Sequence, residues 1–196
     1  MRIRFIILLI LIFAFCQGQH NASNSRFPDS HFAKQNISLK KVMDSLGIDP
    51  NSIRILIEKS KYELSVWYDT IELKKYPVVF GTNPVDDKLR EGDRCTPEGE
   101  FKIHSKYPHK SWSKFIWIDY PNAASWKKHN DAIKKGLIPR DSKIGGEVGI
   151  HGVPINCDYA IDQRQNWTWG CISLKNKDID EIYEVVNSNT IIKIIK

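Results

Sequence analysis

Alternating apolar and polar residues dominate the middle of the chain. Three successive runs are rich in Ile, Val and Tyr and are separated only by brief polar turns; they cover residues 52–60, 62–69 and 71–81. Alternation with a period of two predicts half-buried strands, and the short turns predict an antiparallel meander. Similar runs predict further strands over residues 98–105, 114–121, 147–153 and 190–196.

Helical periodicity marks other segments. An amphipathic helix is expected between Ser38, a candidate N-cap, and Gly47, a stop signal. Residues 122–136 have a helical spacing of Trp126 and Ile133, which predicts a helical insertion between two of the strands.

A third helix is predicted over residues 178–189. Apolar residues recur there at i, i+3, i+4 and i+7, and Asp178 and Glu181 have the spacing of a capping box. Together the elements predict a mostly-β single domain of the α+β type, decorated with a few short helices and without internal repeats.

The first residues have the pattern of a secretory signal. Residues 1–18 combine a positive start, an apolar run over 5–15 and a candidate cleavage site. The run is shorter than a membrane span requires, which favours a cleaved signal over a membrane anchor, with lipidation of Cys16 as a further alternative. Residues 19–52 are expected to form a linker and the short amphipathic helix, and residues 53–196 the main domain.

Composition and charge narrow the function. A hydrophobic content of 41%, with 11% aromatic residues, suffices for a packed core and excludes a disordered chain. The formal net charge of +6 falls by two once Arg2 and Arg4 leave with the signal. The lysine and aromatic mixture over residues 105–117 suggests a solvated loop running into a strand, or one wall of a cleft for an acidic substrate. Export argues against nucleic acid as a partner.

Export also changes how the cysteines are interpreted, because thiols tend to pair in oxidising compartments. Without Cys16, three cysteines remain, at positions 95, 157 and 171, so at least one is free or paired between chains. Cys171 follows Gly170, and His151 stands at the end of an apolar strand between Gly149 and Gly152. A cysteine nucleophile needs a base and an oxyanion donor array, and these two segments offer both.

Two sequence blocks resemble the L,D-transpeptidase catalytic domain (YkuD-type). In the first, the His-Gly pair at 151 is followed by sixteen residues and then by Thr168-Trp169-Gly170-Cys171. The second block, upstream, has several residues in the family's order: Gly81, Lys88, Gly92, Asp93, Thr96, Pro97 and Gly99. The resemblance covers residues 53–196 and implies an L,D-transpeptidase-like β-sandwich.

The resemblance implies roles for individual residues. Cys171 is the implied nucleophile and His151 its general base, with the carbonyl of Gly152 orienting the imidazole. The amides of Gly170 and Cys171 are the implied oxyanion donors, and a His⁺ partner is expected to lower the pKa of the thiol so that a thiolate exists at neutral pH. Thr168 belongs to the same substrate-binding segment.

Two positions depart from the family pattern. Trp169 stands where a His is common, which removes a polar group from the cleft and adds an apolar wall. Ser173 stands where many relatives have Arg or Asn, so a carboxylate-binding group is lost, and Lys175 or Arg164 is the expected substitute.

The activity implied by the resemblance is acyl transfer on peptidoglycan stem peptides, through a Cys171 thioester. Attack by an amine of another stem gives a cross-link, and attack by water gives L,D-carboxypeptidase action. The implied role is in cell-wall organisation and cell shape, in the periplasm or cell envelope after secretion across the inner membrane. No cofactor, metal or nucleic acid is expected, membrane proximity would require an uncleaved signal, and a monomer is the default.

Several alternatives stay open. Cys95 and Cys157 either form a disulfide beside the cleft or are separate thiols, and a zinc site made with His151 has unfavourable spacing. Trp167 is either core or cleft floor. Asp93 and Thr96 are expected to form turns, and His104, His109 and His129 to be surface or strand residues. The rival functions are a non-catalytic wall-binding domain and a cysteine protease acting on proteins.

Overall fold

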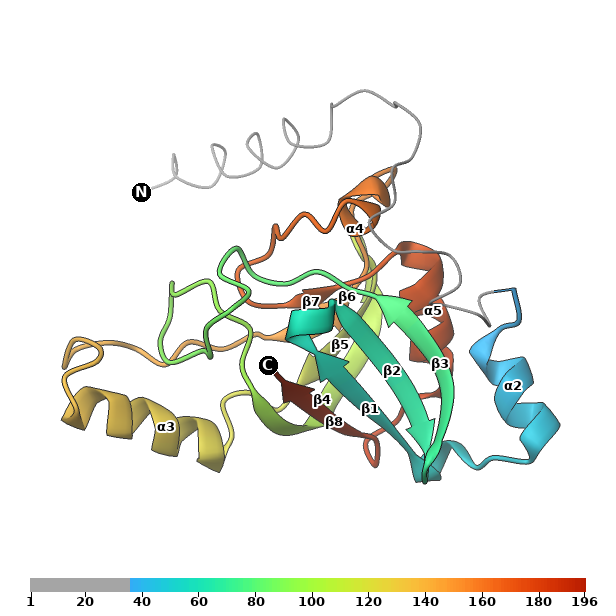
Figure 1. Cartoon of the computed structure of the whole chain (residues 1–196), viewed down its shortest axis with the longest axis horizontal. Coiled ribbons are helices and arrows are strands. Elements are labelled where there is room, and N and C mark those ends of the chain that lie inside the picture. The colour runs from blue at the N-terminus through green and yellow to red at the C-terminus, as the bar shows by residue number, and fades with distance from the viewer. Residues whose placement is uncertain (1–35) are drawn as a thin grey trace.

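The strands form one curled eight-stranded sheet in the computed structural model, which describes residues 36–196 (Figure 1). The predicted signal peptide and the linker up to residue 35 lie outside the described residues. The sheet order is β3-β2-β1-β8-β4-β5-β6-β7. The strands are β1 (Ile53–Glu58), β2 (Glu63–Tyr68), β3 (Ile71–Pro77), β4 (Gly99–His109), β5 (Ser113–Ile118), β6 (Gly149–His151), β7 (Ile172–Ser173) and β8 (Ile191–Ile195). The predicted mostly-β fold with a few short helices is confirmed.

One half of the sheet is the predicted meander. β1 pairs antiparallel with β2, and β2 pairs antiparallel with β3. Alternate residues of β1 are buried, as the period of two predicts. The predicted strand near the C-terminus is also confirmed, but it lies inside the sheet, parallel to β1 and antiparallel to β4.

β4 belongs to both halves of the sheet. Its first residues pair with β8, and its later residues pair with β5 from Ile103 on, with an irregularity between Ile103 and Ser105. β5 then pairs antiparallel with β6, and β6 pairs parallel with the short β7. The C-terminal ends of β6 and β7, at His151 and Ser173, therefore lie side by side at one edge of the sheet.

Two helices pack against each other beside the meander: α2 (Leu39–Leu46) and α5 (Asn176–Val185) (Figure 1). α2 begins and ends as predicted, at Ser38 and Gly47. The capping box predicted for α5 is wrong, because the N-cap is Lys175 and makes no side-chain cap bond.

Glu181 instead joins three elements. Its Oε2 accepts hydrogen bonds from the backbone N–H of Leu39 (3.0 Å), from Lys74 Nζ (2.7 Å) and from Tyr76 Oη (3.0 Å). Capping would require this carboxylate to face its own helix terminus, whereas a buried lysine of β3 draws it across to the sheet. The residue thus fixes α2 and α5 against β3.

The predicted helical insertion is confirmed as α3 (Ala123–Lys134), which extends away from the sheet at the left of Figure 1. Its buried face differs from the predicted one, since Ser125, His129 and Ala132 are buried while Trp126 is exposed. His129 was expected to be a surface or strand residue, but it is buried in this helix, where its Nδ1 lies 2.7 Å from the carbonyl oxygen of Leu89. α3 therefore supports the loop over residues 83–98.

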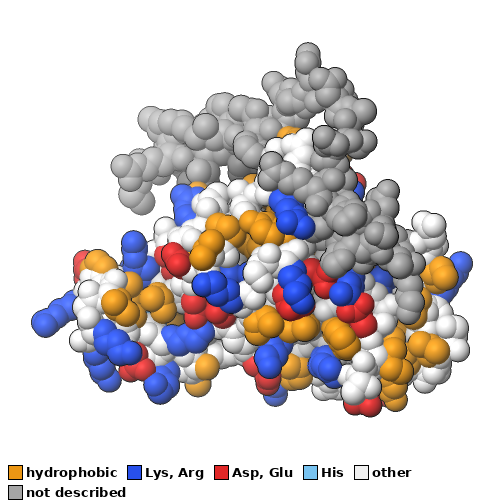
Figure 2. Space-filling view, in the orientation of Figure 1, with side chains coloured by type: hydrophobic (Ala, Val, Ile, Leu, Met, Phe, Trp, Pro, Cys, Tyr) orange, Lys and Arg blue, Asp and Glu red, His pale blue; other side chains and the backbone are white. Residues whose placement is uncertain are grey.

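The main core lies between the sheet, α2 and α5, and consists mainly of Ile, Leu and Val side chains. A short helix, α4 (Tyr159–Asp162), precedes the segment that returns to β7. On the face seen in Figure 2, lysines and arginines are scattered among acidic side chains rather than gathered in one patch. Within residues 36–196, every helix is too short or too polar to span a bilayer.

Candidate active site

His151 is the last residue of β6 and is buried. Its Nδ1 lies 2.7 Å from the carbonyl oxygen of Gly152. A carbonyl can only accept, so Nδ1 carries the proton and Nε2 is left as the basic nitrogen. The Gly152 oxygen also accepts a hydrogen bond from Ser173 Oγ (3.3 Å). Ser173, one of the two positions that depart from the family pattern, therefore helps to fix the carbonyl that orients the imidazole.

Cys171 immediately precedes β7. The parallel register of β6 and β7 places His151 opposite Ser173, two residues beyond the cysteine. The thiol lies 3.6 Å from the carbonyl oxygen of Glu147, to which it donates. The sequence-predicted pair, His151 and Cys171, therefore lies on adjacent parallel strands, with Cys171 level with the start of β6 and two residues short of the position opposite His151.

Thr168 shapes the turn that presents the cysteine. Its Oγ1 donates to the carbonyl of Cys171 (2.7 Å) and accepts from the amide of Gly170 (3.2 Å). Its own amide donates to the carbonyl of Phe80 (3.2 Å), which ties the turn to the segment after β3. The Gly170 amide is thus already engaged, in contrast to a free oxyanion donor.

Both predicted catalytic groups are neutral at pH 7. Burial lowers the pKa of His151 to about 4, against a raising effect of the Gly152 hydrogen bond. Burial raises the pKa of the Cys171 thiol to about 11; the Gly149 amide and Lys88 act in the lowering direction and Glu147 in the raising direction. The expected thiolate is therefore wrong for the resting protein, because desolvation outweighs the favourable charges.

Aromatic rings surround the imidazole. Trp112 stacks on His151 with ring centroids 4.3 Å apart, while Phe115 lies at 5.6 Å and Trp167 meets it edge-on at 5.5 Å. Trp167 thus contributes to the wall around His151 and is half-buried. The sequence analysis offered residues 105–117 as a loop or as one wall of a cleft but did not single out Trp112, a lone tryptophan in the turn between two predicted strands.

Trp112 also holds the backbone beside the imidazole. Its carbonyl accepts a hydrogen bond from the amide of Gly152 (3.0 Å). Its ring also stacks with the imidazole of His109, with centroids 4.3 Å apart. His109 is a strand residue, as one of the two predicted alternatives had it, and this stack links it to His151 through the tryptophan. The turn between β4 and β5 therefore belongs to the site.

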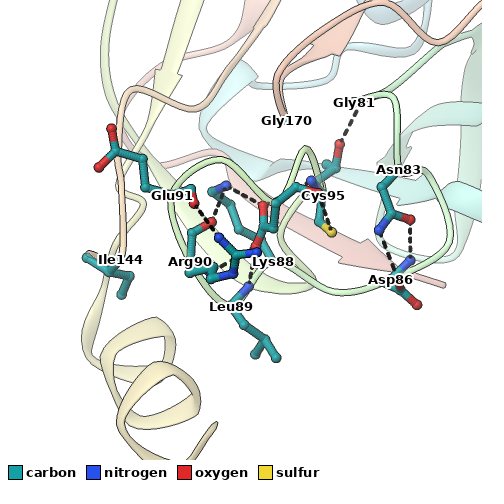
Figure 3. A network of polar contacts seen from close by, with 12 residues as sticks. Gly81, Asn83, Asp86, Lys88, Leu89, Arg90, Glu91, Cys95, Ile144 and Gly170 are labelled. Carbon is teal, nitrogen blue, oxygen red and sulfur yellow. Dashed lines mark hydrogen bonds and ion pairs between the residues drawn. The ribbon is translucent and has the colours of Figure 1, made fainter. Parts of the chain in front are cut away.

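The loop over residues 83–98 packs against Gly170, the residue before Cys171 (Figure 3). Lys88 is buried and donates to Asp93 Oδ1 (2.8 Å) and to the carbonyl of Arg90 (3.1 Å). Asp93 also accepts from the amides of Leu89 and Arg90 (2.8 Å each) and of Cys95 (3.0 Å). Its turn-forming role is confirmed.

Close backbone contact joins this loop to Gly170. The carbonyl of Cys95 would lie 2.6 Å from a Cβ atom at Gly170, whose φ of 134° is also unsuited to other residues. Thr96 Oγ1 accepts from the amide of Gly81 (3.4 Å), which is a long-range contact and not the local turn bond that was predicted. The upstream sequence block and the Cys171 block thus form one packed unit.

The predicted substitutes for the missing carboxylate-binding group are engaged elsewhere. Lys175 forms an ion pair with Asp162, and the guanidinium of Arg164 lies over the ring of Tyr62 at 5.2 Å. Trp169 is 63% exposed and carries the guanidinium of Arg94 on its ring, 3.9 Å from the centroid. Arg94 is a residue that sequence reasoning missed.

The remaining cysteines correct another prediction. Cys95 is a buried free thiol and Cys171 is free, while Cys157 is disulfide-bonded, so the predicted bond between Cys95 and Cys157 is wrong. The turn anchored by Asp93 directs Cys95 Sγ to the carbonyl of Asp93 at 3.3 Å. In the part of the chain that the structure describes, no cluster of three His, Cys, Asp or Glu side chains could hold a metal ion.

Comparison with known proteins adds a family and a fold. The sequence pattern of the L,D-transpeptidase catalytic domain (YkuD) matches residues 52–194. The comparison with curated proteins gave no match. Among solved structures, the helical cell shape determining protein Pgp2 from Campylobacter jejuni is similar at 20% identity with a TM-score of 0.55, over 81% of this chain and 55% of that one.

The protein Bd1075 from Bdellovibrio bacteriovorus is similar at 18% identity with a TM-score of 0.51, over 74% of this chain and 48% of that one. At these identities the likeness concerns the fold alone. The chain spans about half the length of both structures.

Proposed function

Because the chain belongs to the L,D-transpeptidase catalytic domain family, we propose that it is an exported cell-wall enzyme that transfers acyl groups of peptidoglycan stem peptides through Cys171. The observation that carries the proposal is the Nδ1 contact of His151 with the Gly152 carbonyl, which leaves Nε2 as a base on the strand next to the one that Cys171 precedes. Peptidoglycan modification in the cell envelope is the activity that the family assignment supports.

The resting state is a neutral thiol and a neutral imidazole, so the proposed first step is general-base catalysis. As Sγ bonds to the carbonyl carbon of the L-centred residue, the thiol proton passes to His151 Nε2. The carbonyl π electrons move to oxygen, and the resulting oxyanion accepts from the amide of Cys171. Gly170 contributes its amide only after the bond to Thr168 Oγ1 opens.

Collapse of this intermediate breaks the C–N bond to the terminal D-amino acid. The imidazolium donates its proton to the departing amine, and a thioester remains on Cys171. An amine of a second stem then attacks the thioester to form a cross-link, or water attacks to release a shortened stem. In both cases His151 removes a proton from the nucleophile and returns one to the sulfur.

A non-catalytic wall-binding domain is the second candidate. It is favoured by the thiol pKa of about 11 and by the exposed Trp169, which offers a flat apolar surface to a sugar or peptide. The two candidates differ in whether Cys171 becomes acylated, because a binding domain needs no reactive thiol.

Intact-mass spectrometry after incubation with a carbapenem distinguishes them. We expect one covalent adduct on the wild type and on Cys95→Ala, and none on Cys171→Ala or His151→Ala. Cys95 is a matched control, since it is the other free thiol among residues 36–196 and its pKa is also about 11. In parallel, muropeptide tetrapeptides should lose their terminal D-alanine. Folded protein that gives neither an adduct nor turnover would exclude the enzyme.

A further inference from the structure

Arg94 and Trp169 form a stacked pair at the edge of the candidate active site. The guanidinium carbon lies 3.9 Å from the centroid of the indole, which is short for a cation–π contact. Trp169 comes two residues before Cys171 and remains largely exposed, so the pair faces solvent beside the nucleophile. We propose that Arg94 binds the terminal carboxylate of the peptide substrate, on the leaving D-amino acid; this inference rests on the proposed function.

The backbone places Arg94 there firmly. Its carbonyl accepts from the amide of Asn83 (3.2 Å) and would lie 2.0 Å from a Cβ atom at Gly81. The amide nitrogen of Gly170 would lie 3.0 Å from that same Cβ position. The backbones of Arg94 and Gly170 therefore both pack against Gly81. The distance between Arg94 and Gly170 cannot change without breaking this packing.

The local conformation of Arg94 points to function as well. Its φ is 62°, in the left-handed region that glycine and asparagine adopt more readily than arginine. Residues held in this region concentrate at functional sites, where the surrounding structure maintains them. Here the hydrogen bonds that Asp93 receives from both sides of the turn supply that support.

Charge distinguishes Arg94 from the other cations near the candidate active site. Lys88 is paired with Asp93 and Lys175 with Asp162. Among residues 36–196, no carboxylate lies within ion-pair distance of Arg94. Its guanidinium uses its face on the indole, so the N–H groups along its edge stay available for a carboxylate, which they can bind in bidentate geometry.

The opposite charge lies on another segment. Glu147 is exposed, its carbonyl contacts Cys171 Sγ, and its carboxylate raises the pKa of the thiol. A substrate carboxylate is repelled by this group and attracted by Arg94, so the leaving amino acid is directed toward Trp169. The predicted ligand class is therefore a peptide whose scissile bond is followed by one residue with a free carboxylate.

The test compares a stem tetrapeptide with a free terminal carboxylate and the same peptide with a C-terminal amide. We expect the wild type to release the terminal residue from the acid with a kcat/KM about 10- to 100-fold higher than from the amide, as charge-assisted hydrogen bonds allow. Arg94→Ala should lose this preference because its kcat/KM falls for the acid and stays unchanged for the amide. Arg94→Lys should retain part of the preference. Arg90→Ala is the matched control, since Arg90 is exposed in the same loop and its side chain donates only to a backbone carbonyl.

Binding to Cys171→Ala protein keeps this test separate from that of catalysis. Calorimetry with both peptides should give a preference for the acid that disappears in Cys171→Ala/Arg94→Ala. If neither peptide is turned over, the proposed enzyme fails while this binding preference still decides the role of Arg94. Equal affinity for acid and amide in Cys171→Ala protein, or an equal loss for both peptides in Arg94→Ala, would overturn the inference.

Discussion

The indole of Trp112 lies almost parallel to the imidazole of His151, with centroids 4.3 Å apart and planes 24° apart. The same tryptophan accepts the Gly152 amide through its carbonyl, so one residue of the β4–β5 turn controls both the ring and the backbone of the proposed base. The stack excludes water from the imidazole, which is the main reason for its low pKa.

Replacing Trp112 should therefore alter the pH dependence of the reaction. In Trp112→Ala, water reaches His151 and its pKa rises from about 4 toward its ordinary value near 6.5, so the acidic limb of kcat/KM moves to higher pH. We also expect kcat at pH 7.5 to fall about 10- to 100-fold as the ring loses its orientation. Trp112→Phe should restore most of both properties, and an acidic limb unchanged in Trp112→Ala would contradict the shielding role.

Alkylation should report the raised pKa of Cys171. The rate of iodoacetamide modification can be measured from the mass of the peptide that contains Cys171. This rate should increase steadily with pH up to about pH 11, without a plateau near neutrality. Glu147→Gln removes a negative charge that raises the pKa, so its rate at pH 8 should exceed that of the wild type. A plateau below pH 7 would show a stable thiolate, contrary to the neutral pair described above.

Asp178 makes stability depend on pH. Burial raises its pKa from 3.8 to about 6. The folded state then holds a proton that the unfolded state has released, so its contribution is present below about pH 4 and is lost as pH rises through about 6. Asp178→Asn should therefore gain about 1–3 kcal/mol in unfolding free energy relative to the wild type at pH 7, and nothing at pH 3.5. Urea titrations at both pH values check the difference, which equal shifts would contradict.

Gly152 should tolerate no side chain. A Cβ atom there would lie 2.1 Å from Asn176 Oδ1 and 2.6 Å from the carbonyl of Trp112. Gly152→Ala should destabilise the fold by about 1–3 kcal/mol and displace the acceptor of His151 Nδ1, abolishing carbapenem acylation. Gly146→Ala is the control, because a Cβ atom there meets nothing within 4 Å. Acylation of Gly152→Ala at the wild-type rate would refute the role of this contact.

Local patterns in the sequence predicted most of the fold. Strand alternation identified the meander and the last strand, and Ser38 and Gly47 predicted the ends of α2. Pairing partners were beyond that reasoning, since the apolar run of β8 fits an edge or a central strand equally well. The capping box failed because a tertiary ion pair with Lys74 outweighs a local bond for Glu181.

At the site, motif spacing predicted His151, Cys171 and the Gly152 contact, although their catalytic roles stay proposals. The missing parts depend on side chains from distant segments. Trp112 and Arg94 had no periodic or motif signal, and only the folded chain brings them to His151 and Trp169. The neutral state of the pair was likewise out of reach, because desolvation follows from packing that the sequence does not specify.

The position of β8 has a consequence for how the molecule assembles. Arg54 of β1 pairs with Ile191, and Lys102 of β4 pairs with Ile191 from the other side. Without β8, therefore, β1 and β4 each lack a neighbouring strand on one side, and the two halves of the sheet are not joined. Closing contacts over such a sequence separation slows folding and discourages stable partial structures. The meander and the strands that carry His151 and Cys171 should therefore gain and lose their order together, in a single cooperative transition.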